Sequence, residues 1–307
     1  MVITCGRKGK TTLYIVQEVF HILPFITRTD LASEAHALWQ SSADKTTQLQ
    51  GVIAREEKLA GFLVTNVDII SDEGAQALGK PQGRYSTLEL ERLPLHADGD
   101  FDAACHALAG IIARCLPQGA ESFLIAALGN PDVTPDALGP LCAENVIVTR
   151  HLKRQMPDAF KAMSDVAVFR TGVLGTTGIE SALSVSTLVS ELRSDCVIAV
   201  DALAGSELGR LCRTVQVCDS GIAPGSGVGN DRAALSRDTL GVPVIAVGVP
   251  TVVDASGFGD DRELAGMFVT PRYIDDAVRT AARLIGYSVN LAVHPGISMQ
   301  EVGELLN

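Results

Sequence analysis

The chain has 307 residues, 47% of them hydrophobic, so it can bury a substantial core as one α/β domain or two smaller ones. Its net charge of −11 and pI near 5.0 argue against nucleic-acid binding, which needs clustered Lys and Arg. Seven cysteines without a C-x-x-C pair or a Cys/His metal spacing indicate reduced thiols in a cytoplasmic compartment, and we expect no metal or other cofactor.

The N-terminal residues resemble a signal peptide only superficially. An apolar stretch at 13–26 follows three basic residues, but Gln17, Glu18 and His21 interrupt it and no small-residue cleavage site follows. It is also shorter than the ~20 apolar residues that a membrane span needs. We therefore expect a leader or propeptide over residues 1–30 and no membrane partner.

Residues 28–120 alternate short strand-like pieces, at 51–54 and 61–65, with polar turns, and a helical pattern follows from about Phe101 to Cys115. From Ser122 onward, strands alternate with helices. The predicted strands lie near 123–128, 166–170, 196–201, 214–218 and 243–249, and the predicted helices near 136–145, 179–193 and 273–286. This order predicts an α/β fold, a mostly parallel sheet with helices on both faces and an N-terminal β-rich elaboration. No linker interrupts the chain, so we expect a single domain over residues 31–307.

Two aspartates follow apolar strand-like runs and are themselves followed by helix-forming sequence. Asp136 comes two residues after Thr134, so we expect Thr134 to be an N-cap and the carboxylate to lie in the first helical turn. Asp201 ends the run 197–200, which places it at the carboxyl edge of a strand. Each could simply stabilise a helix start or bond loop amides, but this edge of a parallel sheet is also where catalytic groups collect.

The two acids together favour a sharper interpretation, in which both lie in one cleft at the carboxyl edge of the sheet. If their carboxyl groups approach closely, one stays protonated while the other acts as a base, as in aspartic peptidases. The ionised member would draw a proton from water. The protonated member would polarise a peptide carbonyl and help the amine to leave.

A glycine-rich segment at 218–230 lacks the last glycine of a dinucleotide-binding loop. We interpret it as a tight turn that lines the cleft and offers backbone donors to an oxyanion. Its candidate cleft residues are Asp219, which we interpret as loop-capping, Ser220, Gly225 and Gly227.

Other catalytic templates are absent from the sequence. It contains no G-x-S-x-G elbow, no H-E-x-x-H and no phosphate-binding loop ending in Gly-Lys-Ser or Gly-Lys-Thr. His151 is a supporting candidate because it is the only histidine close in sequence to a candidate acid.

Several short segments between about Arg28 and Asp254 resemble, in the same order, segments of the spore germination protease family. These segments are 28–32, 83–88, 128–140 around Asp136, 149–152, 178–180, 198–204 around Asp201, 219–221, 224–230 and 244–254.

The resemblance implies an endopeptidase that degrades small acid-soluble spore proteins during germination. It also implies a zymogen made in the cytoplasm of the developing spore, a homotetramer, and the phosphorylase/hydrolase-like fold of hydrogenase-maturation peptidases. Asp136 and Asp201 match the family's proposed catalytic pair. The chain departs from the family at Ala223, where a His is common, in the short connection 255–267, and in its leader.

Two alternatives stay open. The first is a metal-assisted maturation peptidase on the same fold, with Asp136, Asp201 and His151 near a divalent ion. The second is a binding or scaffold protein that keeps the fold without catalysis, against which the retention of both aspartates counts.

The stretch from Thr29 to Glu34 resembles the sites that the family cuts in its substrates: an acid, a large apolar residue, then small and acidic residues. We therefore predict self-processing between Asp30 and Leu31, with the apolar part of the leader packed on or near the cleft beforehand. The competing interpretation is a simple helix entry with Thr29 or Asp30 as N-cap. Both can hold together.

Overall fold

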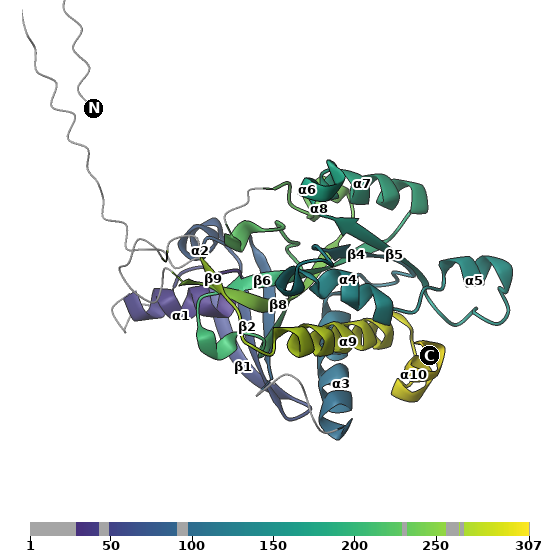
Figure 1. The fold of residues 1–307 in the computed structure, drawn as a ribbon, viewed down its shortest axis with the longest axis horizontal. Helices are drawn as coiled ribbons and strands as arrows, with labels where there is room; N and C mark the ends of the chain where they lie inside the picture. The colour runs from purple at the N-terminus through teal and green to yellow at the C-terminus, as the bar shows by residue number, and fades with distance from the viewer. Residues whose placement is uncertain are drawn as a thin grey trace, which may run out of the picture.

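The computed structural model describes residues 29–42, 49–90, 98–228, 232–255, 264 and 267–306. Most of the predicted leader therefore lies outside the described residues. Nine strands in the described part of the chain form one sheet in the order β1-β2-β3-β7-β8-β6-β4-β5, with β9 paired to β8 (Figure 1). The strands are β1 Val52–Leu59, β2 Phe62–Ile69, β3 Gly83–Glu89, β4 Ser122–Leu128, β5 Asp165–Gly172, β6 Cys196–Gly205, β7 Thr214–Cys218, β8 Val244–Asp254 and β9 Phe268–Val269.

The sheet is mixed, with a parallel half and an antiparallel half. Strands β8, β6, β4 and β5 run parallel, whereas β1, β2, β3 and β7 pair antiparallel, as do β7 and β9 with β8. The hairpin β1–β2 forms because Ala60 and Gly61 adopt the positive φ values, 49° and 91°, that a tight two-residue turn needs. The α/β class and the N-terminal β-rich part are confirmed, but the sheet is less parallel than the sequence pattern indicates because β7 reverses direction.

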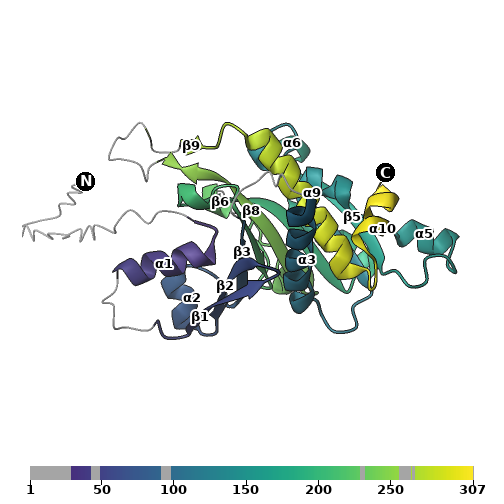
Figure 2. The same cartoon turned by 90° about the horizontal axis from the view of Figure 1, so that it is seen from below.

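Helices cover both faces of this sheet. They are α1 Ala32–Ser42, α2 Asp72–Leu78, α3 Asp98–Cys115, α4 Leu138–Cys142, α5 Arg150–Gln155, α6 Leu174–Thr177, α7 Ser181–Leu192, α8 Arg237–Leu240, α9 Ile274–Val293 and α10 Met299–Leu306. Short 3-10 turns are η1 Thr134–Asp136, η2 Ala143–Asn145, η3 Leu208–Arg210 and η4 Ser226–Val228. Helices α3 and α9 lie side by side across one face, as Figure 2 shows, while α1, α2, α7 and α8 pack on the other.

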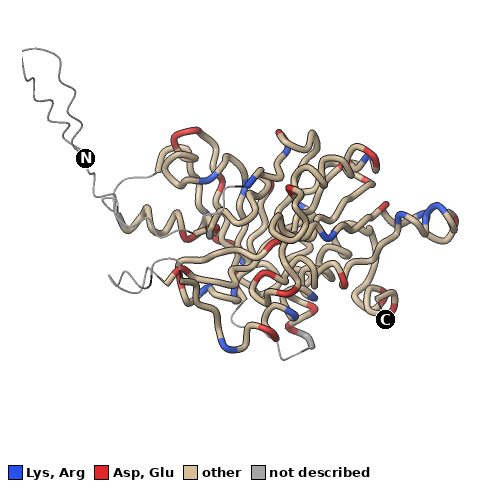
Figure 3. Tube along the Cα trace, turned by 45° about the horizontal axis from the view of Figure 1, so that its top comes forward, with Lys and Arg blue, Asp and Glu red and all other residues tan. Residues whose placement is uncertain are grey.

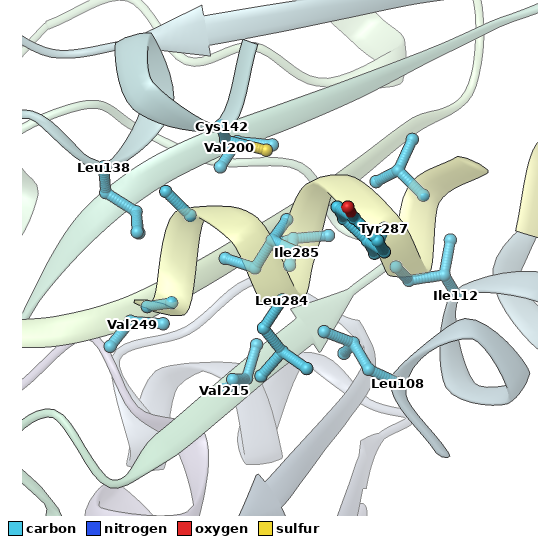
Figure 4. Packing of buried hydrophobic residues seen from close by; sticks show 14 of the residues in the cluster. Leu108, Ile112, Leu138, Cys142, Val200, Val215, Val249, Leu284, Ile285 and Tyr287 are labelled. Carbon is cyan, nitrogen blue, oxygen red and sulfur yellow. The ribbon is translucent and has the colours of Figure 1, made fainter. Parts of the chain in front are cut away.

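The main core lies under α3, α4 and α9. Leu108 of α3 and Ile285 of α9 pack in one cluster with Val200 of β6 and Val215 of β7, and Figure 4 shows these side chains around α9. At roughly 25 cal/mol per Å² of apolar surface removed from water, burial of each such side chain contributes about 1.5–3 kcal/mol. Successive side chains along each strand point to opposite faces of the sheet. The strand residues that lie between those of this cluster therefore face α1 and α7.

The five strands expected in the C-terminal half are confirmed as β4 to β8, and the helices expected near 179–193 and 273–286 are α7 and α9. The helix expected over 136–145 is instead three short pieces, η1, α4 and η2. The break arises because the amides of Asp136 and Ala137 bond carbonyls three residues back, at Val133 and Thr134, which is a 3-10 pattern.

Gly139 allows α4 to rest directly on the ends of β4 and β6. A Cβ there would lie 2.1 Å from the Leu128 carbonyl oxygen and 2.6 Å from that of Val200. We expect Gly139→Ala to lower the free energy of unfolding by about 1–3 kcal/mol, because backbone atoms cannot move aside cheaply. Thermal unfolding measures the effect.

The matched control is Gly175→Ala in α6, where an added Cβ would meet no heavy atom within 4 Å among the described residues. It should change stability by no more than about 0.5 kcal/mol. Equal melting temperatures for the two variants would contradict the packing argument.

Candidate active site

Asp201 lies inside strand β6 instead of ending it, which corrects the expectation from the sequence. β6 runs on to Gly205 because it stays paired with β8, whereas its pairing with β4 stops at Ala127 and Val200. Asp201 is thus the first β6 residue beyond the ladder with β4. Its side chain is buried, with 5% exposed, and its Oδ1 accepts the N–H of Ala202 at 2.9 Å.

The turn after β4 brings Asp136 to the same edge of the sheet. Gly129 has φ of 110°, and a Cβ there would meet the backbone oxygen of Asp136 at 2.0 Å, so this turn requires glycine. The N–H of Asn130 donates to Oδ2 of Asp136 at 2.9 Å. Thr251 of β8 donates its hydroxyl to the Pro135 carbonyl at 2.7 Å, which ties the turn to the sheet.

Thr134 is not the N-cap expected from the sequence. Val133 occupies that position and makes no side-chain cap. The Thr134 hydroxyl donates instead to Oδ1 of Asp275 in α9, at 3.0 Å. This bond fixes η1 against the helix that covers the sheet.

Asp136 and Asp201 line one cavity of about 310 Å³, together with Asp30 and Arg232. Apolar side chains, among them Val133 and Leu203, form much of the rest of its wall. Three carboxyl groups and one guanidinium therefore share a partly apolar pocket, in which charges interact more strongly than in water.

Burial raises the pKa of both candidate acids. For Asp201 the pKa is raised well above its ordinary value, first by burial and then by the charge of Asp136, with a smaller contribution from Asp30. For Asp136 burial also raises the pKa, while the Asn130 amide and the charge of Arg232 oppose the rise. The pair is therefore biased toward a protonated Asp201 beside an ionised Asp136.

Arg232 is a cavity residue that the sequence analysis missed. It is the only Lys or Arg lining this cavity within the part of the chain that the structure describes, and its charge lowers the pKa of Asp136 and of Asp201. Elsewhere basic positions are interspersed with acidic ones along the chain (Figure 3). No local pattern could have found it, because its role depends on carboxyl groups that are distant in sequence.

A second cavity of about 740 Å³ adjoins the first and shares Asp30 and Asp201 with it. Asp219, Ser220 and Gly225 of the glycine-rich turn line it. Oδ1 of Asp219 accepts the N–H of Arg84 at 2.7 Å, and the Ser220 hydroxyl donates to that of Tyr85 at 2.9 Å.

Gly227, the fourth candidate of this turn, lies against the carboxylate of Asp30. A Cβ at Gly227 would lie 2.2 Å from Oδ2 of Asp30, so the close approach requires glycine. The end of the turn, at 229–231, lies outside the described residues.

Asp30 places the N-terminal segment in the cleft. Its N–H donates to the Ala204 carbonyl at 2.8 Å, and its Oδ2 accepts the Ala204 N–H at 2.9 Å. Its Oδ1 accepts the hydroxyl of Ser226 at 2.9 Å. Leu31, the next residue, is fully buried.

Glu34 anchors the beginning of α1 four residues further on, and its side chain is fully buried. Oε2 accepts the N–H and the hydroxyl of Ser206, both at 2.7 Å, and the hydroxyl of Thr29. Thr29 also accepts the N–H of Leu31 at 3.0 Å. The segment is therefore a helix entry whose Asp30 also lines the cleft.

His151 does not join the site. It is exposed on α5, near the point where Thr149 donates its N–H to Val166 in the first part of β5. That is the amino edge of the parallel strands, whereas Asp136 and Asp201 lie toward their carboxyl edge. Closeness in sequence misled here because α4 and η2, which lie between Asp136 and His151, carry the chain back to the other end of the sheet.

Within the described ranges, no group of three or more His, Cys, Asp or Glu side chains is arranged to hold a metal ion. The same residues include no helix that is both long and apolar enough to cross a membrane.

Comparison with known proteins gives consistent matches. Residues 29–263 match the family described as germination protease. Among curated relatives, germination proteases of Caldanaerobacter subterraneus and Clostridium perfringens are 38% and 34% identical, each over 91% of this chain and 98% and 99% of theirs. One from Bacillus cereus is 42% identical over 80% of this chain and 68% of its own. Among solved structures, a NiFe hydrogenase maturation protease from Thermococcus kodakarensis aligns at 18% identity over 58% of this chain and 98% of its own, with a TM-score of 0.35.

Burial of Asp201 predicts a stabilising effect of Asp201→Asn at neutral pH. Because its pKa is raised in the folded state, the folded chain binds more protons than the unfolded chain above the unfolded pKa of about 3.9. Stability contributed at this position therefore falls as pH rises through the folded pKa. The variant should melt above the wild type at neutral pH and lose this advantage below about pH 4.

Thermal unfolding of both proteins over a pH series tests this expectation. The exposed Asp132→Asn, on the same turn as Asp136, controls for the change from carboxylate to amide. A gain that is independent of pH, or equal in the control, would show that burial of Asp201 is not its cause.

Proposed function

Because this chain belongs to the germination protease family, we propose that it is an endopeptidase that cleaves small acid-soluble spore proteins with Asp136 and Asp201 as its catalytic pair. Family membership makes it a protease of spore germination. The observation that carries the finer proposal is the single cavity lined by both carboxyl groups.

The two acids take different roles in this mechanism. Asp201, the more buried, holds a proton, and Asp136 is the ionised base, supported by the Asn130 amide and by Arg232. Asp136 removes a proton from water as the water oxygen bonds to the scissile carbonyl carbon. The C–N bond then breaks, the amine leaves with a proton supplied by the pair, and the products are a carboxylic acid and an amine.

The substrate preference follows from the segment that already lies in the cleft. Asp30, Leu31 and Glu34 repeat the acid, apolar residue and second acid of the sites that the family cuts, and backbone and hydroxyl donors bind both carboxylates. The family resemblance supports the remaining features: a homotetramer in the spore cytoplasm that acts without a cofactor.

The same placement supports self-processing between Asp30 and Leu31. The carboxyl side chain of Asp30 lines both cavities, and its charge contributes to the raised pKa of Asp201. The residue before the susceptible bond therefore lines the same cavities as the proposed catalytic acid, which favours an intramolecular reaction.

Asp136→Asn and Asp201→Asn should each reduce peptidase activity by about 10²- to 10⁴-fold, because each removes one half of the proton-transfer pair. Activity is measured on a peptide that spans residues 26–38 of this chain, with Asp132→Asn as the matched surface control. Full activity in Asp201→Asn would assign catalysis to another residue.

Reagents that modify serine or cysteine, and metal chelators, should leave this activity unchanged, since the proposed chemistry uses water and two carboxyl groups. The assay is repeated before and after dialysis against a chelator. Activity lost on dialysis and restored by a divalent ion would establish the metal-assisted alternative. A purified chain that cleaves neither the peptide nor a spore-protein substrate would favour the binding protein.

Incubation at mildly acidic pH should cut the chain between Asp30 and Leu31, because the pair needs one proton. N-terminal sequencing and intact mass determine the position of the cut. An active enzyme that still begins at Met1, or an equal rate of cleavage in Asp136→Asn, would refute self-processing at this bond.

A further inference from the structure

A row of three residues crosses the sheet beneath the N-terminal segment. Gln216 of β7 pairs with Gly248 of β8, and Gly248 pairs in turn with Asp201 of β6. Directly paired residues point to the same face, so the side chains of Gln216 and Asp201 rise on either side of Gly248. Two strand spacings, roughly 9.6 Å in all, separate their backbones.

The glycine in the middle of this row lies against the side chain of Leu203. A Cβ at Gly248 would lie 2.6 Å from Cγ of Leu203 and 2.8 Å from the Asp201 carbonyl oxygen, so only glycine fits at this position. Asp30, Asp201, Gln216 and Gly248 all line the larger cavity.

The N-terminal segment is held at its backbone by the side chain of Gln216. The side-chain Nε2 donates to the carbonyl oxygen of Asp30 at 3.0 Å, and Oε1 accepts the N–H of Ala32 at 2.8 Å. The two ends of one amide thus hold both sides of Leu31. The carbonyl that Gln216 contacts belongs to the peptide bond between Asp30 and Leu31.

We propose that Gln216 is a catalytic residue, whose side-chain N–H binds the scissile carbonyl oxygen and stabilises the negative charge that develops there when water adds. This inference rests on the proposed function, because it takes the bond after Asp30 as the one that is cut. It adds a third participant to the aspartate pair.

The chemistry suits a neutral amide. When the water oxygen bonds to the Asp30 carbonyl carbon, the C=O π electrons move to oxygen, and the Gln216 N–H is already directed at that atom. The oxyanion returns its electrons as the C–N bond breaks, and the Leu31 nitrogen takes a proton from the pair. An amide donates without ionising, so it adds no charge to a cleft that holds Asp30, Asp136 and Asp201.

A lysine also fixes the carbonyl that precedes this bond. Lys80 is partly buried, and its Nζ donates to the Thr29 carbonyl at 2.8 Å. The Thr29 and Asp30 carbonyls are therefore held by different side chains, and Gln216 holds the one at which water would add.

The experiment separates catalysis from simple anchoring of the segment. Gln216→Glu keeps an oxygen that accepts the Ala32 N–H but, when ionised, cannot donate to the Asp30 carbonyl. Gln216→Met loses both contacts. In the full chain, both variants should slow cleavage after Asp30 by about 10²- to 10³-fold at neutral pH, and Gln216→Glu should recover as its carboxyl group gains a proton.

Thr87→Val is the matched control. Thr87 pairs with Gln216 on the same face, and the one hydrogen bond of its hydroxyl among the described residues goes to the Ser33 hydroxyl, at 3.3 Å. It should cleave at close to the wild-type rate. Thermal unfolding confirms that each variant is folded.

The outcomes distinguish this inference from the function on which it rests. A wild-type chain that stays intact at every pH overturns self-processing, and the role of Gln216 falls with it. A wild type that cleaves, an inert Asp201→Asn and a fully active Gln216→Glu overturn the role of Gln216 alone. Slow cleavage in Gln216→Met with normal cleavage in Gln216→Glu shows that Gln216 only anchors the segment.

A second readout needs no activity. Asp30 and Leu31 form the only Asp-Leu pair in the sequence, so labelling with carbonyl-¹³C aspartate and ¹⁵N leucine gives one coupled signal from this peptide bond. In the Asp201→Asn background the bond stays intact, and Gln216→Met should move the carbonyl signal upfield as the hydrogen bond is lost. An unchanged signal would overturn the contact.

Discussion

The carboxyl group of Asp201 belongs to a residue that is only 5% exposed, within an apolar strand at the centre of the sheet, and the groups around it determine its pKa. Taking an ionised carboxylate out of water is strongly unfavourable, so such a group is either neutralised or surrounded by donors. Here the Ala202 amide and the Arg232 cation favour its charge, while burial and Asp136 oppose it. The opposing effects dominate, so the pKa of Asp201 is raised well above its ordinary value.

The two faces of the sheet explain why the site lies where it does. One face carries a continuous apolar cluster under α3, α4 and α9. On the other face the buried residues form two separate clusters, one under α7 and α8 and one under α1 and α2. Asp201, Gly248 and Gln216 lie on this second face, and the N-terminal segment crosses it.

Much of the sheet could be predicted from the sequence because the C-terminal strands are apolar enough to be found from the hydrophobic pattern alone. β3 was missed because its Arg84, Ser86 and Thr87 are polar residues that only tertiary pairing places in a strand. The extension of β6 beyond Asp201 depends on its partner β8, which no local pattern encodes. Arg232 and Gln216 were missed for the same reason, since the role of each depends on residues that are distant in sequence.

Cleavage after Asp30 would free only half of the cleft. The contacts of Asp30 with Ala204 and Ser226 would be released with the leader, and the Nε2 of Gln216 would become available. On the other side of the cut, Leu31 is fully buried, and the sequence that follows it stays bound through Ala32, Ser33 and Glu34. A substrate that binds in the same register needs that space, so activity on other proteins requires the beginning of α1 to withdraw as well. Cutting and opening are then separate steps, and the hydrogen bonds of residues 32–34 oppose the second.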